Sequence, residues 1–359
     1  MRLIAALSLL LAATAAHAQF DLEESHTTAS LRGVDALGDG VAWASGTNGT
    51  ILRTEDGGYL WQPCTIPTGA EKLDFRGIQG FDANTAVAMA SGPGTASAVY
   101  KTTDGCQTWK RVFTNPDAKG FFDNIHKVTS KQMYMMGDQV DGQFTVFFSP
   151  DRGDTWSIAD DPGREADKGD GGFAASNSGL TAVGSTIYFV TGGSAVAHVY
   201  NTYGKCDPGA AQGASCPLAW QKTGLPLAAG NSASGAFSIA GRTTAGMSGK
   251  LSAVLVAVGG DYQKPDATAG TAAWSKDGGK TWTAATTMPH GYRSAVVFDS
   301  ATQSWLTAGP NGTDISFDDG KTWKPVAGPT ADSWNALSLP FAVGPKGRIG
   351  KLRAGVLKP

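Results

Sequence analysis

A recurring eight-residue motif is the feature that most restricts what this chain can fold into. Three segments share the pattern Ser-x-Asp-x-Gly-x-Thr-Trp, at 149–156, 275–282 and 316–323, and two more, 54–61 and 102–109, differ from it at two positions. The Ser or Thr and Asp side chains suit bonds to nearby backbone groups, and Gly suits the positive φ of a tight turn. Thr then restarts a strand, and Trp supplies a large ring to bury. The motif therefore predicts a tight hairpin between two strands.

The tryptophans of these five copies leave one long gap, between Trp156 and Trp282. Trp220 lies in this gap, after an insertion that runs from Cys206 to Cys216. We interpret this segment as a degenerate sixth copy whose turn has been lengthened. The chain contains four cysteines, an even number that is typical of disulfide pairing in exported proteins. We expect one disulfide between Cys206 and Cys216 and another between Cys64 and Cys106.

A second pattern precedes each motif: an aromatic residue or Leu, a variable residue, and two mostly small residues. Its copies begin at Leu31, Phe75, Phe122, Phe173, Phe237, Tyr292 and Trp334. Apolar strands that break at a glycine connect the two patterns. Seven such units predict an all-β, seven-bladed β-propeller of four-stranded antiparallel blades, with residues 20–28 supplying the missing outer strand of the last blade.

The first eighteen residues have the pattern of a secretory signal peptide, with Arg2, an apolar stretch, and Ala16-His17-Ala18 as the cleavage site. We expect residues 19–359 to form one exported domain, periplasmic or secreted, because no later stretch is apolar enough to span a bilayer. Lys plus Arg (29) nearly balance Asp plus Glu (31), which argues against a nucleic-acid partner. We expect a monomer.

The repeated motif resembles the Asp-box, or BNR repeat, of sialidases, sortilin-type receptors and the photosystem II stability/assembly-factor family. Repeats over almost the whole chain and a terminal Gly-x-x-Gly-Arg-Ile at 344–349 make the last of these families the nearest resemblance. The resemblance implies a scaffold or chaperone-like role with a protein or small anionic partner, and a patch of arginines on one face that engages it.

Successive loops of a blade alternate between faces, so we expect binding on the face opposite the Asp-boxes. The variable position of the second pattern should point into the central channel, and its occupants are Arg32, Arg76, Asp123, Ala174, Ser238, Arg293 and Asn335. A longer turn at 259–266 carries several polar and aromatic side chains, among them Asp261, Tyr262 and Lys264, and should project over the same face. Arg32, Arg76, Asp123, Arg293, Asp261, Tyr262 and Lys264 are therefore the candidate binding residues.

Two alternatives remain open. The arginines could pair with acidic residues in a water-filled channel, or they could recognise an anion. A sialidase-like glycoside hydrolase would also combine Asp-boxes with arginines, a tyrosine and an acid. However, Gly follows both Arg32 and Arg76, so the sialidase Arg-Ile-Pro opening is absent. No catalytic residue, metal or cofactor is assigned from the sequence.

Overall fold

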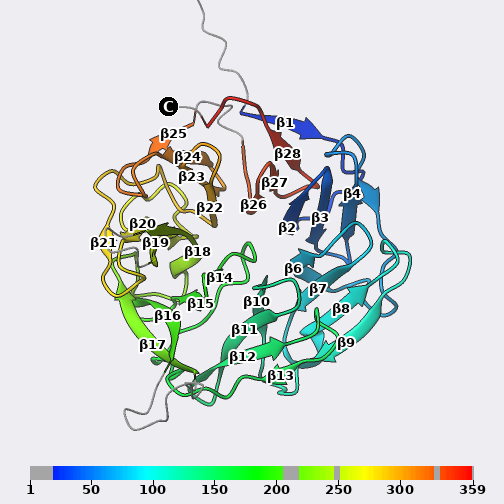
Figure 1. Ribbon diagram of the computed structural model, residues 1–359, viewed down its shortest axis with the longest axis horizontal. Helices are drawn as coiled ribbons and strands as arrows, with labels where there is room; N and C mark the ends of the chain where they lie inside the picture. The colour runs from blue at the N-terminus through cyan, green and yellow to red at the C-terminus, as the bar shows by residue number, and fades with distance from the viewer. Residues whose placement is uncertain (1–18, 205–217, 246–250, 327–331, 358–359) are drawn as a thin grey trace, which may run out of the picture.

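The computed structural model describes residues 19–204, 218–245, 251–326 and 332–357. Seven four-stranded antiparallel sheets surround a central channel, which confirms the predicted seven-bladed propeller (Figure 1). A 3₁₀ turn at Gly94–Ala96 is the only helical element of the described residues. In the same residues we find no helix long and apolar enough to cross a membrane.

The first three blades follow the chain from the inner strand outward. Blade 1 contains β2 (Leu31–Gly38), β3 (Val41–Gly46), β4 (Ile51–Thr54) and β5 (Gln62–Pro63). Blade 2 contains β6 (Asp74–Gly80), β7 (Ala86–Ser91), β8 (Ala98–Thr102) and β9 (Lys110–Thr114). Blade 3 contains β10 (Phe122–Lys127), β11 (Met133–Val140), β12 (Gln143–Ser149) and β13 (Ser157–Ile158).

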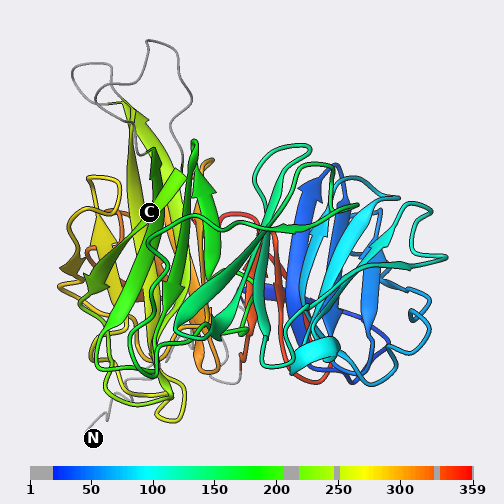
Figure 2. The same ribbon diagram turned by 90° about the horizontal axis from the view of Figure 1, so that it is seen from below.

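The next three blades repeat this order. Blade 4 contains β14 (Leu180–Val183), β15 (Thr186–Thr191), β16 (Ala197–Gly204) and β17 (Leu218–Leu225). Blade 5 contains β18 (Ser234–Ala245), β19 (Leu251–Asp261), β20 (Ala272–Ser275) and β21 (Thr283–Ala284). Blade 6 contains β22 (Ala295–Asp299), β23 (Ser304–Gly309), β24 (Gly312–Ser316) and β25 (Lys324–Pro325). Figure 2 shows β18 and β19 projecting beyond their neighbours on one face.

Blade 7 is built from both ends of the described chain. Its inner strands are β26 (Ala336–Ser338), β27 (Phe341–Val343) and β28 (Ile349–Leu352), and its outer strand is β1 (Phe20–Glu23). The register pairs Phe20 with Leu352 and Glu23 with Ile349. The outer strand therefore comes from the segment to which the sequence assigned it, and this pairing closes the ring (Figure 1).

The five motif turns share one set of side-chain bonds. The Oγ of the first residue accepts a hydrogen bond from the backbone N–H four positions later, at 2.8–3.1 Å. The Asp carboxylate accepts another from the N–H four positions after it, at 2.9–3.0 Å. Hydrogen bonds from Thr108 lower the pKa of Asp104 to about 2, which shows how strongly the turn favours the ionised carboxylate. These bonds hold the turn between the third and fourth strands of each blade.

The hydrophobic core lies between neighbouring blades. One cluster joins Phe122 and Phe147 of blade 3 to Val87 and Val99 of blade 2, and another joins Trp61 of blade 1 to blade 7. Among the motif tryptophans Trp61 and Trp323 are fully buried, whereas others are only partly buried, as with Trp282. Each blade is therefore stabilised mainly by the blades beside it.

A disulfide adds a covalent link between blades 1 and 2. Cys64 follows β5, Cys106 lies in the motif turn of blade 2, and their Cα atoms are 5.3 Å apart. This confirms the second expected pair. The other expected pair, Cys206 and Cys216, lies outside the described residues, as does the expected signal peptide at 1–18.

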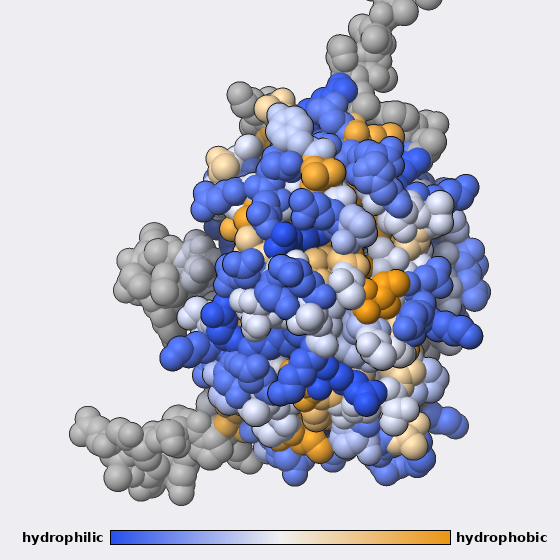
Figure 3. Space-filling view, turned by 90° about the vertical axis from the view of Figure 1, so that its right-hand side faces the viewer, coloured by the Kyte–Doolittle hydropathy of each residue, from blue (hydrophilic) through white to orange (hydrophobic). Residues whose placement is uncertain are grey.

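The outer side of the propeller over blades 1 and 2 is mostly hydrophilic (Figure 3). Apolar side chains on it are scattered as small separate patches. Single exposed apolar side chains are normal for a soluble surface, so this side gives no indication of a docking surface. The channel is the more informative place to look for a site.

Candidate functional site

A cavity of about 560 Å³ opens at the mouth of the central channel. Inner strands begin at this mouth, and because successive strands alternate direction, the motif turns lie on the opposite face. Its lining is polar on one side and aromatic on the other. It consists of Arg32, Arg76, Phe121, Asp123, Asp138, Gly172, Phe173, Ala174, Ala175, Phe237, Tyr262, Tyr292, Ser294, Pro310, Trp334 and Asn335.

A β-bulge near the start of the inner strand selects which side chain faces this cavity. The strand register shifts at Arg32 in blade 1, Arg76 in blade 2, Asp123 in blade 3 and Phe237 in blade 5. A bulged residue has no cross-strand partner, and its side chain is re-aimed. All four of these residues line the cavity. Of the seven predicted channel positions, five line the cavity: Arg32, Arg76, Asp123, Ala174 and Asn335. In blade 5 the prediction was one residue out of place, and Ser238 instead accepts a bond from the Val296 N–H.

Arg32 places a guanidinium in the cavity, and no described residue forms a hydrogen bond or ion pair with it. No hydrogen bond or ion pair to its side chain occurs among the described residues, and its Nε is fully buried without a partner. Burial and the nearby Arg76 lower the pKa of Arg32, while Asp74 and Tyr292 act in the opposite direction. A guanidinium that is partly removed from water and unpaired is a strong binder of carboxylates.

Arg76 differs from Arg32 because it has partners within the chain. Its Nε donates to Asp74 Oδ2 at 2.7 Å, and its Nη1 donates to the Ala174 carbonyl at 3.1 Å. The second bond crosses to the connection before blade 4. Arg76 therefore fits the alternative that channel arginines pair with neighbouring acids, and Arg32 does not.

Two carboxyl groups of blade 3 share the cavity with these arginines. Asp123 is 1% exposed, and its Oδ2 is buried with no hydrogen-bond partner. Asp138 Oδ1 accepts a bond from the Gly172 N–H at 2.9 Å. Burial raises the pKa of both groups, and the negative charge of Asp138 raises the pKa of Asp123 further. Asp138 was not predicted, and it lies inside β11, where the strand register shifts between Gly137 and Gln139.

Aromatic rings form the facing wall. Phe173 stacks on Phe237 with 3.8 Å between ring centroids, and Tyr292 meets Phe237 edge-on at 4.8 Å. Tyr262, which is 48% exposed, also packs edge-on against Phe237. Burial raises the pKa of Tyr292, so its hydroxyl stays neutral. Such rings offer flat apolar contact to a bound chain.

The predicted position of Arg293 was wrong. Its backbone N–H donates to Gly259 O, as Leu31 donates to Gly344 O and Trp334 to Gly309 O. Arg293 therefore takes the place of Leu31, which points into the blade core, and Ser294 takes the cavity position. The error has a physical cause, since one residue of register moves a side chain to the other face.

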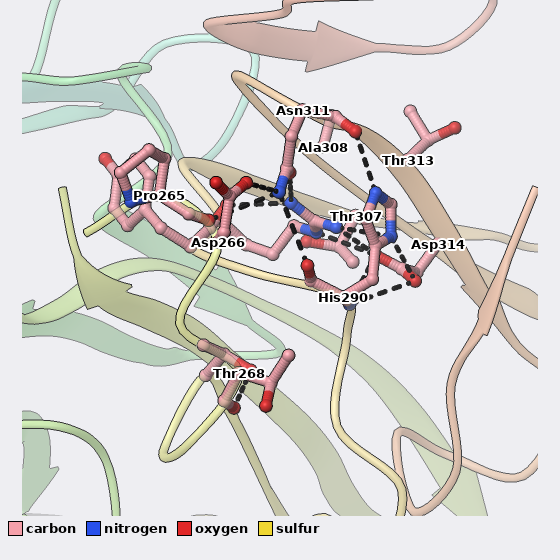
Figure 4. A network of polar contacts seen from close by, with 12 residues as sticks. Pro265, Asp266, Thr268, His290, Thr307, Ala308, Asn311, Thr313 and Asp314 are labelled. Atoms are coloured by element: carbon pink, nitrogen blue, oxygen red, sulfur yellow. Dashed lines mark hydrogen bonds and ion pairs between the residues drawn. The ribbon is translucent and has the colours of Figure 1, made fainter. Parts of the chain in front are cut away.

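Arg293 is fully buried in blade 6, in the network of Figure 4. Its Nε donates to Asp314 Oδ2 at 2.8 Å and its Nη1 to Asn311 Oδ1 at 2.6 Å. Asn311 Nδ2 in turn donates to Pro265 O and to Asp266 Oδ1. The network thus anchors the turn that carries Tyr262 without contributing to the cavity itself.

The other predicted residues of this turn divide between two pockets. Tyr262 lines the channel cavity, whereas Asp261 and Lys264 line a separate pocket between blades 4 and 5. Lys264 Nζ lies 3.6 Å from Asp261 Oδ2 and is largely exposed. In blade 4 the expected strand at Phe173 is a loop, and β14 begins only at Leu180. Phe173 and Ala174 nevertheless reach the cavity from that loop.

These features define the chain as a seven-bladed propeller with a charged and aromatic cavity at one channel mouth. Residues 12–173 match the family described as photosynthesis system II assembly factor YCF48. This match confirms the resemblance drawn from the repeats: the chain is similar to this family over residues 12–173. Among curated proteins no sequence matches this chain.

Solved structures share the fold at low identity. YCF48 bound to D1 peptide is 17% identical, with a TM-score of 0.59 over 94% of this chain and 97% of that one. YCF48 from Cyanidioschyzon merolae is 18% identical, with a TM-score of 0.54 over 94% and 99%. An ancestral GH74 enzyme is 12% identical, with a TM-score of 0.52 over 89% of this chain but only 40% of that one. These likenesses concern the fold.

Proposed function

We propose that this protein is a binding scaffold that holds a segment of a partner protein in the channel-mouth cavity. Arg32 is the observation that carries the proposal, because an unpaired, half-buried guanidinium is costly unless a ligand meets it. We assign to it a carboxylate of the bound segment, held by paired hydrogen bonds. The aromatic wall of Phe173, Phe237 and Tyr262 would contact the rest of the segment.

The likeness to YCF48 supports a peptide as the class of ligand. A similar structure is that of YCF48 bound to D1 peptide, and it shares the architecture of this chain over nearly its full length. Our proposal transfers only the class of ligand, a segment of a partner protein, and the assembly-factor-like role that such binding would serve.

Affinity capture with the folded protein tests the proposal. Arg32→Gln should lose the captured partner while retaining the wild-type melting temperature, and raised salt should imitate the loss. Arg111→Gln is the matched control, because Arg111 is exposed on the outer strand β9. Equal capture by wild-type and Arg32→Gln protein would refute the role of Arg32.

A glycoside hydrolase is the second candidate function. It is favoured by two carboxyl groups of raised pKa beside aromatic rings in one cavity, and by the fold shared with an ancestral GH74 enzyme. This candidate requires release of reducing sugar from a polysaccharide, and that release must disappear in Asp123→Asn. Binding of a partner without hydrolysis of a polysaccharide would exclude the hydrolase and retain the scaffold proposal.

We also propose that the protein is exported and that residues 1–18 are removed. The Cys64–Cys106 disulfide supports an oxidising compartment. Cell fractionation with mass spectrometry of the mature protein should find it outside the cytoplasm, beginning at Gln19. A cytoplasmic protein that retains Met1 would contradict this.

A further inference from the structure

The blade 3 side of the cavity holds two carboxyl groups that lack a cationic contact. Asp123 comes from β10 and Asp138 from β11, and both line the cavity. Within the described residues neither carboxylate forms an ion pair, and Asp123 Oδ2 has no hydrogen-bond donor at all. Buried carboxyl oxygens normally have a hydrogen-bond partner, so the unpartnered Oδ2 of Asp123, close to a second carboxyl group, requires a reason.

Arg76 is the nearest cation, and it does not supply that pairing. Its Nε is bonded to Asp74 and its Nη1 to the Ala174 carbonyl. Its charge lowers the pKa of Asp123, but burial and Asp138 raise that pKa by more. The carboxyl pair therefore has room for a second cation.

Gly172 lies against the carboxyl pair and leaves space for both groups. A Cβ atom at this position would lie 2.3 Å from Asp123 Oδ2, so a side chain here would displace the carboxylate. The Gly172 N–H meanwhile holds Asp138 Oδ1 in place. Because the connection before blade 4 passes as bare backbone, both carboxylates lie beside the cavity.

We infer that Asp123 and Asp138 form a subsite for a basic side chain, lysine or arginine, of the bound segment. The inference rests on the proposed function and adds the chemistry of its ligand. Phe121 and Phe173 line the same cavity and would contact the methylene groups of such a side chain. With Arg32 taking a carboxylate, the cavity selects a segment that carries both an acid and a base, and it discriminates against one that carries only acids.

Binding of the base should release a proton. The charged groups that face Asp123 are Asp138 on β11 and Arg76 on β6. A cation placed beside Asp123 favours its ionised form, so binding lowers the raised pKa of Asp123 and favours release of its proton. Affinity for the basic segment therefore rises as the pH rises through the pKa of Asp123.

Selection of random short peptides on the immobilised full-length protein tests the inference. Retained peptides should be enriched in Lys or Arg together with an acid. Replacing the basic residue of a selected peptide by norleucine should weaken binding at least about tenfold. Asp123→Asn and Asp138→Asn should cause a similar loss, and the norleucine peptide should lose nothing further on Asp123→Asn. Lys and Arg versions of one peptide separate the two kinds of base.

The matched control is Asp141→Asn, because Asp141 is an exposed acid at the β11–β12 turn of the same blade and face. Its affinity should equal that of the wild type. If the retained peptides were not enriched in basic residues and bound equally well to Asp123→Asn, this inference would be overturned. The proposed scaffold function would still stand. Failure to retain any peptide would overturn the proposed function, and the subsite with it.

Discussion

Arg32 and Arg293 have the same sequence context: a large apolar or aromatic residue precedes each, and a small residue follows. Their surroundings differ, because one side chain faces the channel and the other lies inside a blade. Arg32 occupies a bulge, lines the channel cavity and has no partner. Arg293 lies one position earlier in its blade, is fully buried and bonds to Asp314, which is also buried. The bulge register, and not the residue type, therefore decides whether an arginine lines the cavity or lies buried in the blade.

The largest effect is expected from Arg293→Ala. It would leave the buried Asp314 without its arginine partner and with His290 as its remaining ion-pair contact, which costs about 3–5 kcal/mol of unfolding free energy. Chemical denaturation measures the loss. Arg32→Ala is the internal control and should leave the unfolding free energy within about 0.5 kcal/mol. Equal losses for the two variants would contradict the contrast between them.

A double variant sharpens this prediction. Arg293→Met combined with Asp314→Leu removes both charges, so it should recover most of the stability that Arg293→Ala loses. If the double variant were as unstable as the single one, shape rather than charge would explain the role of Arg293.

A smaller loss, about 2 kcal/mol, is expected from Asn311→Ala. Asn311 joins Arg293 to Pro265 and Asp266 and so anchors the turn that carries Tyr262. Hydrogen exchange should therefore increase in residues 261–268 more than elsewhere. Unchanged exchange in that turn would show that the network serves blade 6 alone.

Asp123→Asn should have the opposite sign and raise the unfolding free energy by about 1 kcal/mol at neutral pH. Burial raises the pKa of Asp123, so the folded state binds its proton more tightly than the unfolded state does. The wild type loses this contribution as the pH rises through the folded pKa. Thermal unfolding over a pH series should show the variant and wild type converging below about pH 3.8, the ordinary Asp pKa.

The smallest effect concerns His290, whose pKa is raised chiefly by its hydrogen bond to Asp314. Protonated His290 stabilises the fold at pH values below its unfolded pKa of 6.5, and this contribution disappears as the pH rises through the higher folded pKa. NMR titration of the ring should give a pKa above 6.5, and Asp314→Asn should lower it. An unchanged pKa in that variant would contradict the assignment.

The blade count was predictable because its signals are local. The motif turns and the tryptophans that follow them depend on a few adjacent residues, and the missing strand of blade 7 follows from counting them. The cavity was only partly predictable, since the bulges at Arg32, Arg76 and Asp123 fit the assumed alternation, whereas Phe237 and Ser294 do not. A bulge is set by packing across strands, which a single sequence does not reveal.

Blade 4 illustrates a different limit. Phe173 has the residue type of an inner-strand start, but its loop bridges Gly171 to Gly192, and the strand begins at Leu180. The aromatic residue is used for the cavity wall instead, where it stacks on Phe237. Residue type alone does not distinguish an aromatic side chain that starts a strand from one that covers a ligand site.

The pairing of β1 with β28 also sets an order of events during synthesis. Phe20 is synthesised long before Leu352, yet the two residues are neighbours in one sheet. Blades 1 to 6 can pack against one another in turn as each is synthesised. Blade 7 cannot form until its strand β28 has been synthesised. Until then β1 remains an unpaired edge, and Gln19, whose side chain is buried beside Asp332 and Thr313, has no place to bind. The ring therefore closes only after the chain has been synthesised as far as Leu352.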